Sequence, residues 1–328
     1  MTRARSSLID PGSTPYYHCI ARCVRRAYLC GEDNLTGKNY EHRRQWVVDK
    51  LRELVSIFSI EVCAYAVMSN HYHVVLHINQ KPAREWTRDE ILSRWTRLFT
   101  GPLLVQRYLA ADQLSHSELA RVDEFVEEYR NRLTSISWFM RCLNEYLARQ
   151  ANQEDGCKGR FWEGRFKSQA LLDEAALLTC MAYVDLNPLR AEMAETPEGS
   201  DYTSIQERIE NLEGSDIRKQ PITLMPFRSQ EQNPDKALPY ILRNYLELVD
   251  WSGRAVRSDK KGSIPSDIPP ILTRLEIDSN EWLKTMRCNN RFYRAVGRLE
   301  AMKTFAQEMG QQWVQGVFTC SRLFHGVS

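Results

Sequence analysis

Apolar residues in the N-terminal part of the chain recur at two spacings, one typical of strands and one of helices. Thr14–Val24 and Ile60–Met68 are rich in aromatic and β-branched residues, which favour strands. Between them, the apolar residues of Glu41–Phe58 lie three or four positions apart on a charged segment, which predicts an amphipathic helix. Ser69 and Asn70 then form a tight connection to a third strand. The pattern predicts strand, helix, strand, strand.

Helical spacing prevails after Gln80. The first two of the following helices are strongly charged and interrupt the core, so we interpret residues 85–132 as a helical insertion. Ser168–Leu172 completes the predicted sheet as a fourth strand. The core domain then spans residues 12–204, and residues 205–328 form a mostly helical C-terminal extension. Helices are predicted at Trp86–Leu98, Ser117–Arg132, Ser135–Gln150, Asp173–Tyr183 (capped by Asp173), 237–249 and 289–310.

Composition and charge narrow the class of protein only slightly. The 328 residues carry a net charge of +2, so the distribution of basic residues is more informative than their number. The start lacks the apolar core of a signal peptide, and no run approaches the ~18 apolar residues of a membrane helix. Nine cysteines without a CxxC pair indicate reduced thiols. We therefore expect a cytoplasmic protein without a membrane partner.

Two pairs of residues are candidates for chemistry. His71 and His73 are two positions apart in the third strand, so both side chains lie on one face, opposite Tyr72. Such a pair can bind a divalent metal, although an ordinary exposed strand can have the same pattern. Tyr183 and Asn187 share a face if their helix extends that far. Tyr183 is either a packed core residue or, beside a metal, a nucleophile, because its pKa of ~10 otherwise keeps it protonated.

Four motifs occur in a fixed order: YHCIARCVRR, VMSNHYHVVL, GRFWEGRFKS and YVDLNPLRA. In these motifs the chain resembles the REP-associated tyrosine transposases, within the insertion-sequence-200-like superfamily of single-tyrosine HUH transposases. The resemblance covers about residues 12–204 outside the insertion. It implies an α+β fold with a ferredoxin-like antiparallel sheet and packed helices. It also places the family's metal ligands on His71, His73 and Asn187, and its catalytic tyrosine on Tyr183.

The resemblance also implies a reaction. A Mg²⁺ or Mn²⁺ ion would polarise the scissile phosphate of single-stranded hairpin DNA, and Tyr183 would attack it to give a 5′-phosphotyrosine. The same link can be reversed by a DNA 3′-hydroxyl, so strands are nicked and rejoined without ATP. In agreement, the sequence has neither a P-loop nor a GxGxxG fingerprint, which argues against a nucleotide cofactor. The family further implies a homodimer.

Basic residues cluster in three places, and each cluster has a simpler explanation. In Gly159–Lys167 they interleave with aromatic residues, which suits single-stranded DNA but equally an ordinary hairpin with buried aromatics. Arginines directly after the first strand suit phosphate contacts better than a solvated loop edge. Arginines from 287 to 298 recur at helical spacing and favour DNA contact slightly over a solvated helix face. The predicted DNA-binding residues are Arg22, Arg25, Arg26, Arg160, Arg165, Lys167, Arg291 and Arg294.

Three other interpretations remain open at this point. The first is a domesticated protein that binds DNA hairpins without catalysis, against which the presence of both histidines and the tyrosine argues. The second is a metal-dependent hydrolase that adds His77 or His18 to His71 and His73, although no carboxylate lies near them in sequence. The third is a helical interaction protein that functions through its charged insertion.

Overall fold

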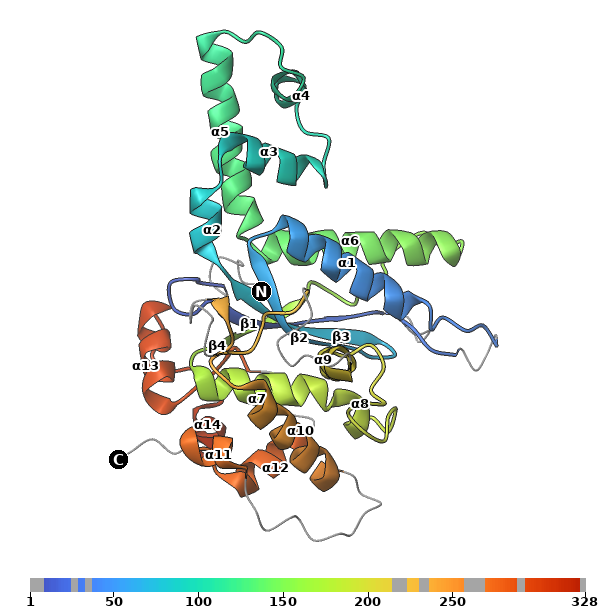
Figure 1. Ribbon diagram of the computed structural model, residues 1–328, viewed down its shortest axis with the longest axis vertical. Helices are drawn as coiled ribbons and strands as arrows, with labels where there is room; N and C mark the ends of the chain where they lie inside the picture. Colours follow the sequence, from blue (N-terminus) through green and yellow to red (C-terminus); the bar gives the residue numbers. More distant parts are fainter. Residues whose placement is uncertain are drawn as a thin grey trace.

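The computed structural model describes residues 9–24, 29–32, 37–213, 223–229, 236–256, 269–287 and 293–324. Its centre is a five-stranded sheet with the order β2-β3-β1-β4-β5. Helices cover both faces of this sheet, with α1 and α6 on one and α7 on the other (Figure 1). The strands are β1 (Tyr16–Arg22), β2 (Ile60–Val67), β3 (His71–Ile78), β4 (Lys167–Leu171) and β5 (Ala295–Val296). The core helices are α1 (Arg43–Ile57), α6 (Ile136–Glu154), α7 (Glu174–Asp185), α8 (Asn187–Arg190) and α9 (Ser204–Glu213).

The first four strands confirm the predicted ferredoxin-like core. In chain order, β1, α1, β2, β3, α6 and β4 form two β-α-β units, and β1 pairs antiparallel with both β3 and β4. The apolar stripes of α1 and α6 pack against one face of the sheet, with residues such as Leu54 and Leu143 fully buried. Buried Arg43 joins α1 to the end of α6 through ion pairs with Glu154 and Asp155.

The charged segment between β3 and α6 is an insertion, as predicted, but it contains four helices rather than two. They are α2 (Gln80–Glu85), α3 (Arg88–Thr96), α4 (Leu103–Leu109) and α5 (His116–Leu133), which project away from the sheet in Figure 1. Both ends of the insertion meet at Ser59, whose backbone N–H donates to Leu133 O (2.9 Å) and whose carbonyl accepts from Asn79 N–H (3.0 Å). The insertion can therefore leave and rejoin the core at one point.

Helices α10, α11, α12 and α14 of the C-terminal extension lie below α7 in Figure 1, and the extension also adds a strand to the sheet. The predicted helix at 289–310 is wrong at residues 293–298, where Ala295–Val296 form β5 parallel to β4. Ala170 N–H donates to Arg294 O and Leu172 N–H to Val296 O, both at 2.9 Å. The described helices are α10 (Leu242–Val256), α11 (Pro270–Arg274), α12 (Ser279–Arg287), α13 (Leu299–Glu308) and α14 (Val317–Leu323). In the part of the chain described above, no helix has the length and apolar character needed to cross a membrane.

The predicted arginine stripe at 287–298 is wrong for the same reason. Arg287 ends α12 and donates to the carbonyl of Ala255 (2.7 Å), whereas Arg298 precedes α13 and donates to that of Leu275 (2.9 Å). Arg287 thus links α12 to the last turn of α10, Arg298 links the start of α13 to the end of α11, and the two share no helix face.

A buried carboxyl fixes the C-terminal end of α7. Asp185 is fully buried and accepts hydrogen bonds from the hydroxyls of Ser204 and Tyr245 and from the Ile205 N–H (3.0 Å). Burial raises its pKa to about 6, although these hydrogen bonds and the nearby Arg208 guanidinium act in the opposite direction. The core and the extension thus share one polar network.

Candidate active site

The two histidines of β3 lie on the α7 face of the sheet, as their spacing predicted. Tyr72 points to the other face, where its hydroxyl donates to Asn144 Oδ1 of α6 (2.8 Å). In the sheet register His71 lies opposite Arg22 and His73 opposite Ile20, so the same face also carries side chains of β1. Strand alternation thus brings a basic residue next to the histidine pair.

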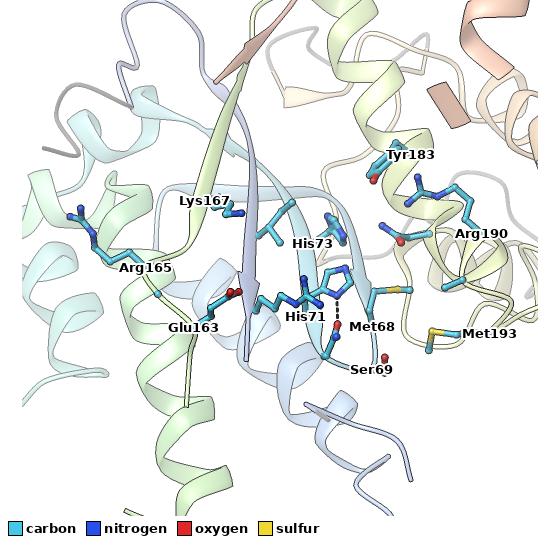
Figure 2. Close-up of a pocket in the computed structure, with 16 residues that line it drawn as sticks. Met68, Ser69, His71, His73, Glu163, Arg165, Lys167, Tyr183, Arg190 and Met193 are labelled. Atoms are coloured by element: carbon cyan, nitrogen blue, oxygen red, sulfur yellow. Dashed lines mark hydrogen bonds between the residues drawn. The ribbon is translucent and has the colours of Figure 1, made fainter. Parts of the chain in front are cut away.

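Both histidines line a cavity of about 870 Å³ between the sheet and the end of α7 (Figure 2). Tyr183 and Asn187 line it as well, so the structure brings together all four residues that the sequence assigned to chemistry. The centroids of the Tyr183 and His73 rings are 6.1 Å apart. The cavity therefore places a tyrosine hydroxyl and two imidazoles around one space.

Tyr183 and Asn187 reach this cavity from two helices, not from one. Asp173 caps α7 by accepting from Ala176 N–H (2.8 Å), as predicted, but the helix ends at Asp185. A separate short helix, α8, begins at Asn187 with Pro188 in its first turn. The proline ring cannot continue the preceding helical hydrogen bonds, which accounts for the break.

Burial and charge keep both histidines neutral. Burial, and to a smaller extent the guanidiniums of Arg22 and Arg190, lower the pKa of His71 to about 4. His73 is 4% exposed, and its pKa lies well below the usual value, mainly because of burial and then because of His18 and His71. Asn70 Oδ1 accepts from His71 Nδ1 at 2.6 Å, a contact drawn in Figure 2. Neutral imidazoles have the lone pair that a metal requires.

The donor atoms fit a divalent metal. His73 Nε2 and Asn187 Nδ2 are buried and have no hydrogen-bond partner among the described residues. Buried polar atoms normally have hydrogen-bond partners, so two neighbouring side chains with such atoms unpaired are what a metal-binding site requires. The Asn187 amide can present its oxygen instead of its nitrogen after a rotation of half a turn. The imidazoles of His71 and His73 and this oxygen would then leave coordination positions on the metal for phosphate oxygens and water.

The additional histidines of the hydrolase interpretation are engaged elsewhere. His77 Nδ1 lies 2.7 Å from Glu61 Oε2, and His18 contacts the Nδ1 of His73, on the side of the ring away from Nε2. Across the described ranges, no three or more His, Cys, Asp or Glu side chains are placed to hold a metal ion together. The structure does not support a three-histidine site.

Arg190 belongs to the site although sequence reasoning gave it no role. Its guanidinium carbon lies 3.8 Å from the centroid of the Tyr183 ring, and the two side chains lie next to each other in Figure 2. The signal was present in the YVDLNPLRA motif, where Arg190 is three positions past Asn187.

The predicted DNA contacts divide into three groups. Arg22, Arg165 and Lys167 line the cavity, which gives it a basic wall. Arg160 is exposed outside the cavity lining, and Arg294 is half-buried near Phe305. The remaining predicted contacts lie outside the described residues: Arg25, Arg26 and Arg291.

The aromatic residues of Gly159–Lys167 serve the core rather than a stacking surface. Phe161 is 2% exposed, and the Trp162 indole N–H donates to Asn144 O (2.8 Å). The segment therefore agrees with the simpler explanation for its aromatics, while its basic residues Arg165 and Lys167 belong to the cavity lining.

Comparisons with known proteins gave one match. No family model and no curated protein matches the chain. Among solved structures, the chain is similar to one described as the structure of the REP-associated tyrosine transposase bound to a REP hairpin. The identity is 11% and the TM-score 0.37, over 70% of this chain and 100% of the other.

Proposed function

We propose that the chain is a transposase-type enzyme that nicks and rejoins single-stranded hairpin DNA. Tyr183 is the nucleophile, and His71, His73 and Asn187 hold Mg²⁺ or Mn²⁺. The observation that carries the proposal is the cavity itself, where the tyrosine, two neutral imidazoles and a basic wall converge from β3, α7, α8 and β1.

The residues of the chain have separate tasks in this reaction. When bound, the metal supplies charge that polarises the scissile phosphate. Arg22, Arg165 and Lys167 bind neighbouring phosphates and orient the strand in the cavity. Arg190, stacked on the Tyr183 ring, fixes the phenol and adds positive charge where negative charge develops.

The chemical step exchanges one ester for another. The Tyr183 Oη–phosphorus bond forms while the bond from phosphorus to the DNA 3′-oxygen breaks. The phenol proton leaves to water, and the released 3′-oxygen takes up a proton to become a hydroxyl. Because the 5′-phosphotyrosine keeps the phosphodiester, attack by a 3′-hydroxyl rejoins DNA without a nucleotide cofactor. A homodimer, which rests on the family resemblance alone, and a cytoplasmic location, which rests on the composition, are further parts of the proposal.

The test is covalent capture of DNA. Labelled single-stranded hairpins from the flanks of the protein's own gene are incubated with Mg²⁺ or Mn²⁺ and resolved on a denaturing gel. We expect an adduct that needs metal, is lost in Tyr183→Phe, and persists in Tyr108→Phe, a matched control on α4 of the insertion. Hairpin binding without any adduct would instead support a domesticated binding protein, and an adduct that survives Tyr183→Phe would identify another nucleophile.

A further inference from the structure

A chain of hydrogen bonds leads from the C-terminal extension to His73. Gln169 Nε2 donates to the backbone carbonyl of Tyr293 (2.9 Å), and Gln169 Oε1 lies 3.5 Å from His18 Nδ1. His18 Nε2 is in turn 2.9 Å from His73 Nδ1. All three side chains are buried, with exposed fractions of 7%, 3% and 4% for Gln169, His18 and His73. Because His18 and Gln169 are paired across β1 and β4, the sheet itself aligns the chain.

The backbone carbonyl of Tyr293 determines which atom donates and which accepts in each of these hydrogen bonds. A backbone carbonyl only accepts, so Gln169 must turn its NH₂ group toward Tyr293 and its oxygen toward His18. That oxygen also only accepts, so the proton of His18 is on Nδ1 and its lone pair on Nε2. His73 must then donate from Nδ1, which leaves its own lone pair on Nε2. This is the atom that is buried without a partner at the cavity.

The opposite arrangement carries two energetic costs, one lone-pair repulsion and one unsatisfied buried donor. If His18 donated from Nε2 to His73, its Nδ1 lone pair would face the oxygen of Gln169. His73 would then carry its proton on Nε2, a buried donor with no acceptor among the described residues. An unsatisfied buried donor typically costs about 1–3 kcal/mol. Both costs therefore favour the tautomer of His73 that carries its proton on Nδ1.

We infer that His18 and Gln169 are positioning residues that hold His73 as the Nδ1–H tautomer, with Nε2 directed to the metal, and that the Tyr293 carbonyl of the C-terminal extension sets this tautomer. The inference rests on the proposed function only in taking His73 as a metal ligand. It also gives the extension a role in the site, since its backbone is the fixed acceptor at the outer end of the chain.

The first measurement is the tautomer in the metal-free protein. Long-range ¹H–¹⁵N correlation spectra of ¹⁵N-histidine-labelled protein report which ring nitrogen carries the proton, and His73→Gln assigns the signal. We expect the proton of His73 on Nδ1 in the wild type and a mixture of tautomers in Gln169→Leu. A wild-type proton on Nε2 would overturn the inference, whatever the activity of the enzyme.

The second measurement is Mn²⁺ affinity by titration calorimetry in the absence of DNA. His18→Leu removes the acceptor for His73 and is expected to weaken Mn²⁺ binding about 10- to 100-fold, the usual effect of losing such a partner. His18→Gln can place an amide oxygen where Nε2 was, so it should recover most of the affinity. Equal affinity in His18→Leu and wild type would refute the positioning role. Circular dichroism and thermal unfolding confirm that each variant folds.

The two proposals fail in different ways. If the wild type shows the expected tautomer but forms no DNA adduct, the proposed function fails and the hydrogen-bond chain stands. If the adduct forms while His73 carries its proton on Nε2, the proposed function stands and the inference fails.

Discussion

Replacing Asp185 by asparagine should remove a pH dependence of stability that this buried carboxyl creates. Asparagine keeps an oxygen to accept from Ser204 and Ile205, and its NH₂ can donate to the Tyr245 hydroxyl. The variant therefore retains the hydrogen bonds of the network and loses only the titrating group.

The magnitude follows from the pKa of this group. Asp185 has a pKa of about 6 in the folded protein against 3.8 when free, so between these values only the folded state holds the proton. Its contribution to stability is fully present below pH 3.8 and is lost as the pH rises through 6. At about 1.4 kcal/mol per tenfold change, the full effect is about 3 kcal/mol, of which about 1.4 kcal/mol develops between pH 8 and pH 5.

The assay is urea unfolding of wild type and Asp185→Asn at intervals between pH 8 and pH 5. The difference between the two free energies of unfolding isolates Asp185, because the other titrating groups, including the buried histidines, are common to both proteins. We expect this difference to move by about 1.4 kcal/mol in favour of wild type as the pH falls. Asp201→Asn, which removes an exposed carboxyl, is the matched control.

A difference that stays constant over this pH range would refute the reasoning. It would mean that the charge of Arg208 and the hydrogen bonds to the carboxylate outweigh burial and keep Asp185 ionised throughout. A difference that moves in favour of the variant at low pH would mean that the folded pKa lies below the unfolded one.

Two further substitutions test the scaffold. Arg43→Ala removes the buried partner of two acids at the end of α6 and should lower the free energy of unfolding by about 2–4 kcal/mol, whereas Arg141→Ala, in an exposed pair, should change it by less than about 0.5 kcal/mol; equal effects in urea unfolding would contradict this. Replacing residues 81–132 by a short glycine–serine linker should preserve folding and DNA adduct formation, because both ends of the insertion meet at Ser59; loss of the adduct in a folded variant would assign the insertion a role in the reaction.

Local patterns were sufficient to predict the core and most of the site. Alternation along β3 placed His71 and His73 on one face, and the cap at Asp173 located the start of the helix that carries Tyr183. These features depend on neighbours in sequence, where side-chain direction and hydrogen-bonding groups are set by the residue itself and a few positions on either side.

The features that were missed depend on partners far away in sequence. Ala295 and Val296 form a strand because the edge of β4 offers unpaired backbone groups, and this pairing outweighs the helical spacing of the arginines around it. His18 contacts His73 across 55 positions, so its spacing in the sequence contains no hint of that contact.

The C-terminal extension is attached to the core at the two elements that the site requires. Tyr245 of α10 holds Asp185, two residues past the tyrosine on α7, and the Tyr293 carbonyl holds Gln169, which faces His18 on the sheet. One contact fixes the helix that carries the proposed nucleophile, and the other fixes the imidazole ring of the proposed metal ligand His73. In the proposed reaction the tyrosine and the metal ligands must keep their separation to within a fraction of an ångström to act on one phosphate. Anchoring both from a common scaffold would therefore give the extension a role in that reaction even where it contacts no DNA.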